Sequence, residues 1–310
     1  MRLLLCAALP VLMMFTAAGW TRQKAPADQW LTKPVDDGTF HTYLEFFKYD
    51  PGVPFEARVI EVSELEGLRR EHLSFQSTPG VRVFANLYWL AGSDSQKPST
   101  LITLHGGGAQ GKDAVNMNRL AALLTRGGSN VLSIDMQYFG ERSTELLSNF
   151  TEPEKHERLY NQPSVYLAWV VHTVKDVGRA YDFLVKEKGA DPRRIGLFGN
   201  SRGAIVGAIA AGADRRLAAV VLLNGGHFDA GELEHLPAAC PANYIGRISP
   251  RPLLMLHGKY DTDHIPATSV EPLYRLARAP KQILWSETGH TFPPEDNQAA
   301  MLKWLRENLK

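Results

Sequence analysis

The segment 193–203, RRIGLFGNSRG, constrains the fold of this chain more than any other. An apolar run leads into GNSRG at 199–203, and the small residues that follow are typical of a helix. This order predicts a buried strand, a sharp turn with Ser201 at its apex, and a helix. Glycines two residues to either side let strand and helix approach closely, and the helix N-terminus favours negative charge beside the serine. Chance supplies about 0.1 such matches in this length, so a plain glycine-rich turn is the alternative.

Strands and helices are expected to alternate on both sides of this segment. Polar and apolar residues alternate at 71–77 and 82–90 around a Thr-Pro-Gly turn, which predicts an antiparallel hairpin. Alternation of apolar strands with helices is typical of a mostly parallel sheet covered by helices on both faces. We therefore predict an α/β fold whose ligands bind at the carboxyl ends of the strands. The strands are expected near 101–104, 130–136, 195–198, 218–223, 252–256 and 282–285, and the helices near 113–126, 165–187, 269–278 and 295–309.

The N-terminus has the pattern of a secretory signal peptide. Arg2 precedes an apolar run and a cluster of small residues that ends near residue 19, and the run is short for a membrane span. We predict cleavage there and a secreted or periplasmic protein without stable membrane insertion, with an uncleaved anchor as the alternative. Three further parts are expected: a leader at 20–66, irregular apart from a short helix near 39–47, that packs on the core; the main α/β domain at 67–310; and insertions within that domain at 137–163 and 225–250.

The charge and the cysteine content of the chain limit the partners and cofactors that we expect. The formal net charge is +1, and removal of the signal peptide would make the chain neutral. We therefore expect no binding to nucleic acid or to a membrane surface. Of the two cysteines, only Cys240 would survive cleavage; it is expected to be a buried structural thiol, and no intrachain disulfide can form. No His/Cys pair has the spacing of a metal site, so we expect no metal and no cofactor.

Three segments at expected strand ends supply what a reactive serine needs. The glycines of HGGG at 105–108 can turn backbone N–H groups toward a pocket, where they and the amide of Arg202 would hold an oxyanion. Asp261 follows a strand and could orient a histidine, with Asp263 as the alternative acid. His290 lies in the loop before the last helix and could move the serine proton. Each segment also has a simpler interpretation. HGGG could be an ordinary turn between a strand and a helix, Asp261 an exposed loop residue, and His290 a loop histidine without a catalytic role.

These motifs resemble those of the α/β-hydrolase superfamily over roughly residues 70–310. They are most similar to the branch that contains dienelactone hydrolases, acetyl xylan esterases and the catalytic domains of prolyl oligopeptidases. The signatures are DxxRAYDFL at 176–184 followed by DPRRI at 191–195, HGxxD at 257–261, and GH at 289–290. The resemblance implies that Ser201 is the nucleophile, Asp261 the orienting acid and His290 the base. It also implies an oxyanion hole made by the amides of Gly107 and Arg202.

The sequence departs from this family pattern at three places. Dienelactone hydrolases proper use a cysteine where this chain has Ser201. The acid motif usually continues as DxxVP, whereas DTDHIP at 261–266 is one residue longer, which keeps Asp263 open as the acid. An arginine after the nucleophile also occurs in glucuronoyl esterases, so the side chain of Arg202 is a candidate for binding an acidic group.

These features predict an exported serine hydrolase that cleaves a small-molecule or carbohydrate ester through an acyl-enzyme, with carbohydrate acetyl esters as candidate substrates. A serine peptidase of prolyl-oligopeptidase type is the alternative, although only about 70 residues precede the hydrolase core. A non-catalytic binding protein is a third reading, which the filled triad positions disfavour. His227 and His257 are expected to be structural or to form a pocket wall. Both insertions are expected to border the pocket, and their aromatic residues are Tyr138, Phe139, Tyr160, Phe228 and Tyr244.

Overall fold

The computed structural model describes residues 29–310 apart from 93–97, 145–150, 229–230 and 233–234. The predicted signal peptide at 1–19 lies outside the described residues. Within the described part, no helix is long and apolar enough to cross a membrane.

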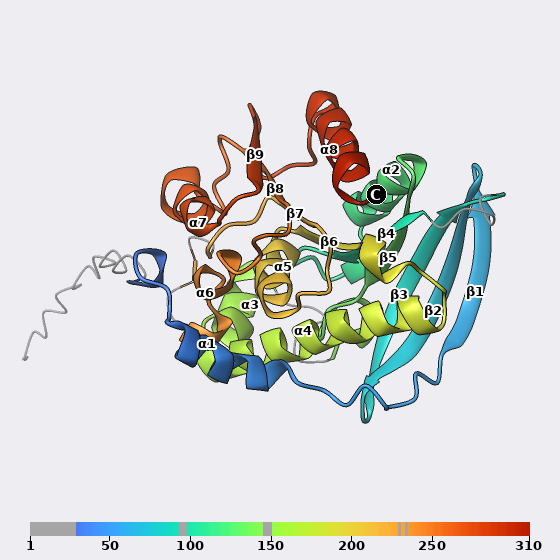
Figure 1. Ribbon diagram of the computed structural model, residues 1–310, viewed down its shortest axis with the longest axis horizontal. Helices are drawn as coiled ribbons and strands as arrows, with labels where there is room; N and C mark the ends of the chain where they lie inside the picture. Colours follow the sequence, from blue (N-terminus) through green and yellow to red (C-terminus); the bar gives the residue numbers. More distant parts are fainter. Residues whose placement is uncertain (1–28, 93–97, 145–150, 229–230, 233–234) are drawn as a thin grey trace, which may run out of the picture.

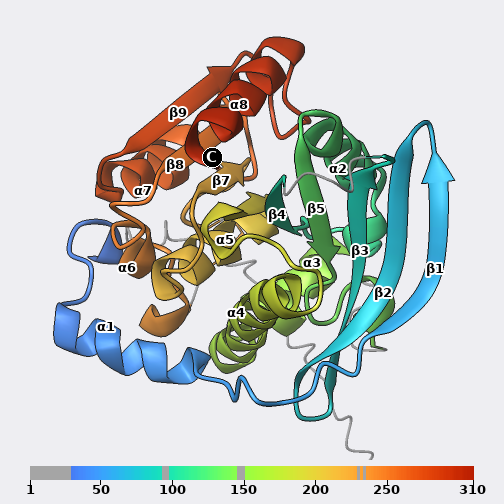
Figure 2. The ribbon, with the colours of Figure 1, turned by 45° about the vertical axis from the view of Figure 1, so that its right-hand side comes forward.

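A nine-stranded sheet runs through the described part of the chain in the order β1-β2-β3-β5-β4-β6-β7-β8-β9 (Figures 1 and 2). The first three strands pair antiparallel, β3 pairs antiparallel with β5, and all the remaining pairs are parallel. The predicted α/β fold with an antiparallel N-terminal edge is therefore confirmed. The strands are β1 (Arg58–Leu65), β2 (Leu68–Thr78), β3 (Val81–Leu90), β4 (Ser99–Leu104), β5 (Ser129–Ile134), β6 (Ile195–Asn200), β7 (Val220–Leu223), β8 (Leu253–Gly258) and β9 (Lys281–Ser286).

Helices cover both faces of the sheet, and each face has its own hydrophobic core (Figure 1). On one face lie α4 (Pro163–Lys186) and α5 (Arg202–Ala213), and on the other lie α2 (Val115–Arg126) and α8 (Glu295–Asn308). Eleven of the twelve residues of α5 are buried, and most of them are Gly or Ala, so the helix fits closely against strands β6 and β7. The shorter helices are α1 (Asp37–Leu44), α3 (Glu152–Lys155), α6 (Ala242–Ile245) and α7 (Glu271–Leu276).

The N-terminal part differs from the sequence expectation at one strand. The segment expected to be irregular contains β1, which extends the hairpin of β2 and β3 into three antiparallel strands. Most of its side chains are exposed, including Val59, Ile60 and Leu65. A strand without a buried face lacks the alternation of polar and apolar residues that identifies strands in a sequence. The helix expected near 39–47 is present as α1 followed by a 3-10 turn, Glu45–Phe47.

One buried arginine joins the N-terminal segment to α4. Arg179 is completely buried and donates hydrogen bonds to the carbonyl oxygens of Pro51, at 3.3 Å, and Val53, at 2.6 Å. Its guanidinium also lies 4.1 Å from the centre of the Phe55 ring. A buried cation requires such partners because the loss of its hydration is costly. Arg179 therefore fixes the path of the chain between α1 and β1.

We expect Arg179→Met to reduce the free energy of unfolding by about 2–4 kcal/mol, because two backbone carbonyl groups lose the buried donor that holds them. Urea denaturation followed by circular dichroism measures the change. The control is Arg193→Met, since the side chain of Arg193 is 86% exposed, and its urea midpoint should stay close to that of the wild type. Equal midpoints for the two variants would show that Arg179 does not anchor the N-terminal segment.

Candidate active site

Ser201 lies at the sharp turn between β6 and α5 with a strained backbone. Its φ is 53° and its ψ is −116°, a conformation that side-chain-bearing residues rarely adopt. A Cβ atom at Gly199 would lie 2.3 Å from the carbonyl oxygen of Gly203, and one at Gly203 would lie 2.4 Å from that of Leu104. Both positions therefore require glycine, which is the physical basis of the GNSRG pattern. The amide of Ser201 donates to the carbonyl oxygen of Leu223 at 2.8 Å and ties the turn to β7.

The structure brings together Ser201, His290 and Asp261, which come from three separate strand ends. The Nε2 atom of His290 lies 2.9 Å from Oγ of Ser201, and its Nδ1 atom lies 2.8 Å from Oδ2 of Asp261. Since a carboxylate can only accept, Nδ1 of His290 carries the proton and Nε2 accepts from the serine hydroxyl. The three side chains thus form one continuous line of hydrogen bonds in the orientation of a Ser-His-Asp triad.

Asp261 rather than Asp263 contacts the histidine closely. Oδ2 of Asp263 lies 3.8 Å from Nδ1 of His290, and this side chain is 60% exposed. Asp261 is 3% exposed, and its Oδ1 accepts the amides of Asp263, at 2.9 Å, and His264, at 3.0 Å. Burial acts to raise the pKa of Asp261, but the hydrogen bonds from His257, His290 and the His264 amide outweigh it and hold that pKa well below its usual range. Asp261 is therefore ionised at neutral pH.

His257 is a second histidine that contacts the carboxylate of Asp261. It is fully buried at the end of β8, and its Nε2 atom lies 3.2 Å from Oδ2 of Asp261 and 3.0 Å from the carbonyl oxygen of His264. It therefore acts as a positioning residue and does not line the cavity. The sequence signal was its place four residues before Asp261 in the HGxxD pattern. His227 lies elsewhere, with Nε2 3.1 Å from Sγ of Cys240, which is buried as expected.

The pKa of His290 is raised above its ordinary value. Burial acts to lower the pKa, and the Arg202 cation lowers it further, but the hydrogen bond to Asp261 and the charges of Asp261 and Asp263 outweigh both. The site thus stabilises the protonated imidazole. That is the state a general base reaches once it has taken a proton.

The glycine loop 105–108 lies directly against the serine turn. A Cβ atom at Gly106 would lie 3.3 Å from Cβ of Ser201, and one at Gly107 would lie 3.3 Å from Cγ of Arg202. His105 fixes the start of the loop, because its Nε2 atom accepts the amide of Met136 at 3.0 Å. Its Nδ1 atom therefore carries the proton and donates to the carbonyl oxygen of Gly106 at 2.6 Å. Burial lowers the pKa of His105 and keeps the ring neutral.

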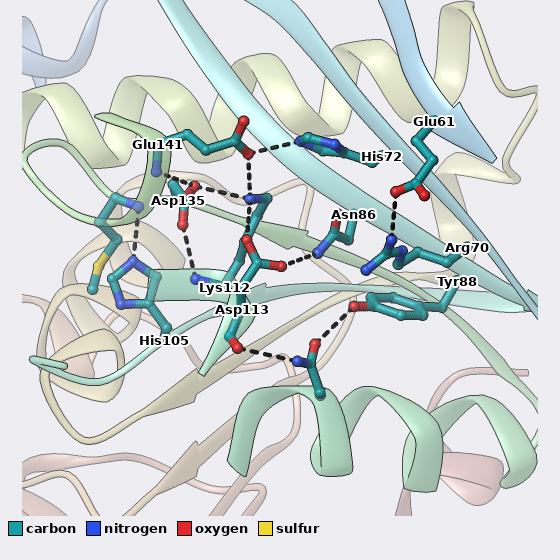
Figure 3. A network of polar contacts seen from close by, with 12 residues as sticks. Glu61, Arg70, His72, Asn86, Tyr88, His105, Lys112, Asp113, Asp135 and Glu141 are labelled. Carbon is teal, nitrogen blue, oxygen red and sulfur yellow. Dashed lines mark hydrogen bonds and ion pairs between the residues drawn. The ribbon is translucent and has the colours of Figure 1, made fainter. Parts of the chain in front are cut away.

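One buried lysine holds this loop and a second holds the segment that follows it, and the sequence analysis identified neither. Nζ of Lys155 donates to the carbonyl oxygen of Gly107 at 2.8 Å and to Glu152 at 2.6 Å. The ammonium of Lys112 is completely buried and lies 3.1 Å from Oδ2 of Asp135 and 2.6 Å from Oε1 of Glu141 (Figure 3). Both lysines look like ordinary surface residues in the sequence, because the partners that bury them, Gly107 for Lys155 and Asp135 and Glu141 for Lys112, are distant along the chain.

Asp135 is the centre of the network around Lys112 (Figure 3). Its Oδ1 accepts the amide of Lys112 at 2.8 Å, and its Oδ2 accepts that of Glu141 at 3.1 Å. Burial acts to lower the pKa of Lys112, but the neighbouring carboxylates raise it overall. The network thus joins the segment after the glycine loop to the turn after β5. The only sequence signal was an aspartate directly after an apolar strand.

The side chain of Arg202 contacts Tyr160 and Glu232. Its guanidinium lies 3.6 Å from the centre of the Tyr160 ring and forms a buried ion pair with Glu232. Glu232 comes from the insertion at 225–250, which therefore reaches the site through this carboxylate. The cation is paired with an anion of the protein itself.

A cavity of about 840 Å³ opens beside Ser201. Of the described residues of the insertions, Glu152 lines it, so the first insertion borders the cavity as expected, whereas no described residue of the second insertion does. None of the described aromatic residues of the two insertions lines the cavity. Phe139, Tyr160, Phe228 and Tyr244 are instead buried in the hydrophobic core, and Tyr138 packs against it. Apart from the glycine loop and the triad, the polar lining includes Gln110, Asp113, Asn116, Arg119, Glu152, Asn224 and Asp263, and Phe292 is its aromatic member.

No family model matches this sequence, and no curated protein sequence matches it. Solved structures do resemble it. An acetyl xylan esterase from Paenibacillus sp. R4 has a TM-score of 0.68 at 16% identity, over 92% of this chain and 100% of that chain. Acetyl xylan esterase 1 from Thermoanaerobacterium sp. JW/SL YS485 has a TM-score of 0.66 at 16% identity, over 93% and 100%. An α/β hydrolase from Penicillium sp. sh18 has a TM-score of 0.57 at 16% identity, over 77% and 99%.

The protein has the α/β-hydrolase fold, as the sequence motifs implied. Among the solved structures that share this fold with it are acetyl xylan esterases. At this level of sequence identity the likeness concerns the fold, and the activity has to be argued from the residues of the site.

The two aspartates can be distinguished by their effect on the pKa of His290. We expect Asp261→Asn to lower this pKa more than Asp263→Asn does, because Asp261 is closer to Nδ1 and is buried away from solvent screening. The histidine proton would then leave at lower pH in Asp261→Asn than in the wild type. NMR titration of the imidazole signals measures both shifts, with His290→Ala identifying the resonance. A larger decrease in Asp263→Asn would make Asp263 the orienting acid.

Proposed function

We propose that this protein is a serine hydrolase that cleaves carboxylic esters through an acyl-enzyme intermediate. The continuous hydrogen-bond line from Ser201 through His290 to Asp261, at a strained turn beside a glycine loop, carries this proposal. Nucleophile, base and orienting acid stand in the relation that acyl transfer requires. The esterases among the structures of the same fold support it.

In the first step, Oγ of Ser201 attacks the ester carbonyl while Nε2 of His290 takes the hydroxyl proton. The carbonyl oxygen becomes an oxyanion, for which we assign the amides of Gly107 and Arg202 as donors. Arg202 is the first residue of α5, so the positive end of the helix dipole adds to the stabilisation. The C–O bond then breaks, and the alcohol leaves with the proton from His290.

In the second step, water attacks the acyl group on Ser201, and His290 again takes a proton and returns it to the serine oxygen. Through both steps, the ionised carboxylate of Asp261 holds the histidine tautomer and stabilises the imidazolium. His257 and the backbone amides at 263 and 264 keep that carboxylate in place. The site therefore needs no further group to complete the proton transfers.

For the substrate, we propose an ester with a polar alcohol part, and carbohydrate acetyl esters are the class that fits best. The lining of the cavity is rich in charged and amide side chains that can bind hydroxyl groups. Acetyl xylan esterases with the same fold support this choice. A secreted or periplasmic location remains part of the proposal, supported by the sequence pattern at the N-terminus.

We expect Ser201→Ala and His290→Ala each to reduce kcat on a short-chain aryl ester by at least about 10³-fold, because the nucleophile or its base is lost. Spectrophotometric release of the phenol measures the rate. Ser63→Ala and His41→Ala change the same residue types far from the cavity and should keep wild-type rates. A fluorophosphonate probe should label the wild type but not Ser201→Ala. Wild-type rates in either triad variant would refute the acyl-enzyme mechanism, and an unlabelled wild type would favour a non-catalytic binding protein.

The peptidase alternative makes a different prediction. We expect kcat/KM on an aryl acetate to exceed by far that on a dipeptide arylamide, because the described residues include no second domain over the cavity that would orient a peptide. Parallel assays with matched chromophores measure the ratio. Ser201→Ala in both assays identifies any activity from contaminants. Comparable values for ester and amide would favour a peptidase of prolyl-oligopeptidase type over an esterase.

A further inference from the structure

Three side chains that commonly bind metals converge in the insertion after β7, away from the triad. They are His227, His235 and Cys240, and one donor atom from each lies within 4.8 Å of the other two. His227 follows the turn at the end of β7, and Cys240 lies two residues before the start of α6. Cys240 and His227 are buried, and His235 is partly buried.

The chemistry of these donors matches zinc. Two imidazole nitrogens and one thiolate form a set that Zn²⁺ binds in tetrahedral sites, and none of the three donors is an oxygen atom, the ligand that Mg²⁺ and Ca²⁺ prefer. The ring of Phe228 contacts both histidines, with centroid distances of 4.6 Å to His227 and 3.8 Å to His235. The donors therefore meet in a largely apolar environment, where coordination to a cation is strong.

The described residues offer one other cluster of potential ligands, formed by Asp261, Asp263 and His290. That cluster is accounted for by the triad, since both nitrogens of His290 have partners there. The cluster in the insertion has no such role in catalysis. Within it, Nε2 of His227 lies 3.1 Å from Sγ of Cys240, and the ring centres of His227 and His235 are 5.7 Å apart.

We propose that His227, His235 and Cys240 bind a Zn²⁺ ion. One nitrogen of each imidazole and Sγ of Cys240 would be the ligands, and a water molecule would fill the fourth position. On binding, the thiol loses its proton to solvent as the Zn–S bond forms, so the affinity rises with pH. The spacings of eight and five residues match no compact zinc motif. For this reason the sequence analysis predicted no metal.

The ion would fix the segment that carries Glu232. Glu232 lies between the ligands His227 and His235 in the sequence, and its carboxylate pairs with Arg202 next to Ser201. A metal that closes this loop would hold the carboxylate on Arg202. The proposed role is structural, so it does not depend on the esterase proposal.

Titration with Co²⁺ tests the site by spectroscopy without an activity assay. The full-length protein is treated with a chelator, dialysed and titrated with Co²⁺, whose complexes with thiolate give a near-ultraviolet charge-transfer band and visible bands typical of four-coordination. We expect one Co²⁺ per chain, displacement of the bands by Zn²⁺, and a higher Tm with metal bound. Cys240→Ser should remove the thiolate band, and His235→Ala should weaken Co²⁺ binding by more than about tenfold.

His41→Ala is the matched control for His235→Ala, because His41 is an exposed residue of α1 and is not a member of the cluster. This variant should keep the bands and the stoichiometry. A thiolate band that persists in Cys240→Ser would refute the site. So would the absence of bands and of a Tm change in a wild-type protein that circular dichroism shows to be folded. The site would be established if Cys240→Ser lost the Co²⁺ bands while the control variant kept them, and if the Tm of metal-free Cys240→Ser equalled that of the metal-free wild type.

Discussion

The close approach of β6 and α5 at Ser201 is the constraint on which the rest of the site depends. The turn holds a non-glycine residue at positive φ, a conformation that costs about 1–3 kcal/mol. It persists because β6 is hydrogen-bonded between β4 and β7 in the middle of the sheet, and because α5 is buried along almost its whole length. Neither element can move away to relax the turn. The strain is thus confined to one residue, and the hydroxyl of Ser201 stays exposed to the cavity.

The second support is a set of buried charges around the glycine loop. Lys155 donates to a carbonyl oxygen of the loop itself. Lys112, in the segment after the loop, is held by Asp135 through both its amide and its ammonium group. Buried ion pairs gain little stability over apolar residues, since desolvation offsets the attraction. They do fix positions closely, because any shift leaves a charge without a partner. We infer that this network serves to place the loop against Ser201.

Features that depend on residues close together in the sequence could be predicted, whereas contacts between distant segments could not. The fold class follows from the alternation of strands and helices, and the turn at Ser201 follows from the two glycines that its geometry requires. The positions of Asp261 and His290 followed from their places after expected strands, and the structure brings both to Ser201. In contrast, β1 has no buried face, and Lys155, Lys112 and Glu232 acquire their partners only through folding. The aromatic residues of the insertions pack inward, which an aromatic composition alone does not distinguish from lining a pocket.

The side chain of Arg202 shows that a sequence resemblance does not fix the role of a residue. In the sequence, an arginine after the nucleophile offered a cation for an acidic substrate. In the structure, Glu232 already pairs with that cation, and Tyr160 covers its face. An anionic substrate would have to displace a buried carboxylate, and the displaced Glu232 would lose its partner in a site that excludes water. For the esterase proposed above, this pair would favour neutral substrates. Arg202 contributes its amide to the proposed oxyanion hole, and its side chain fixes the segment of the second insertion that carries Glu232.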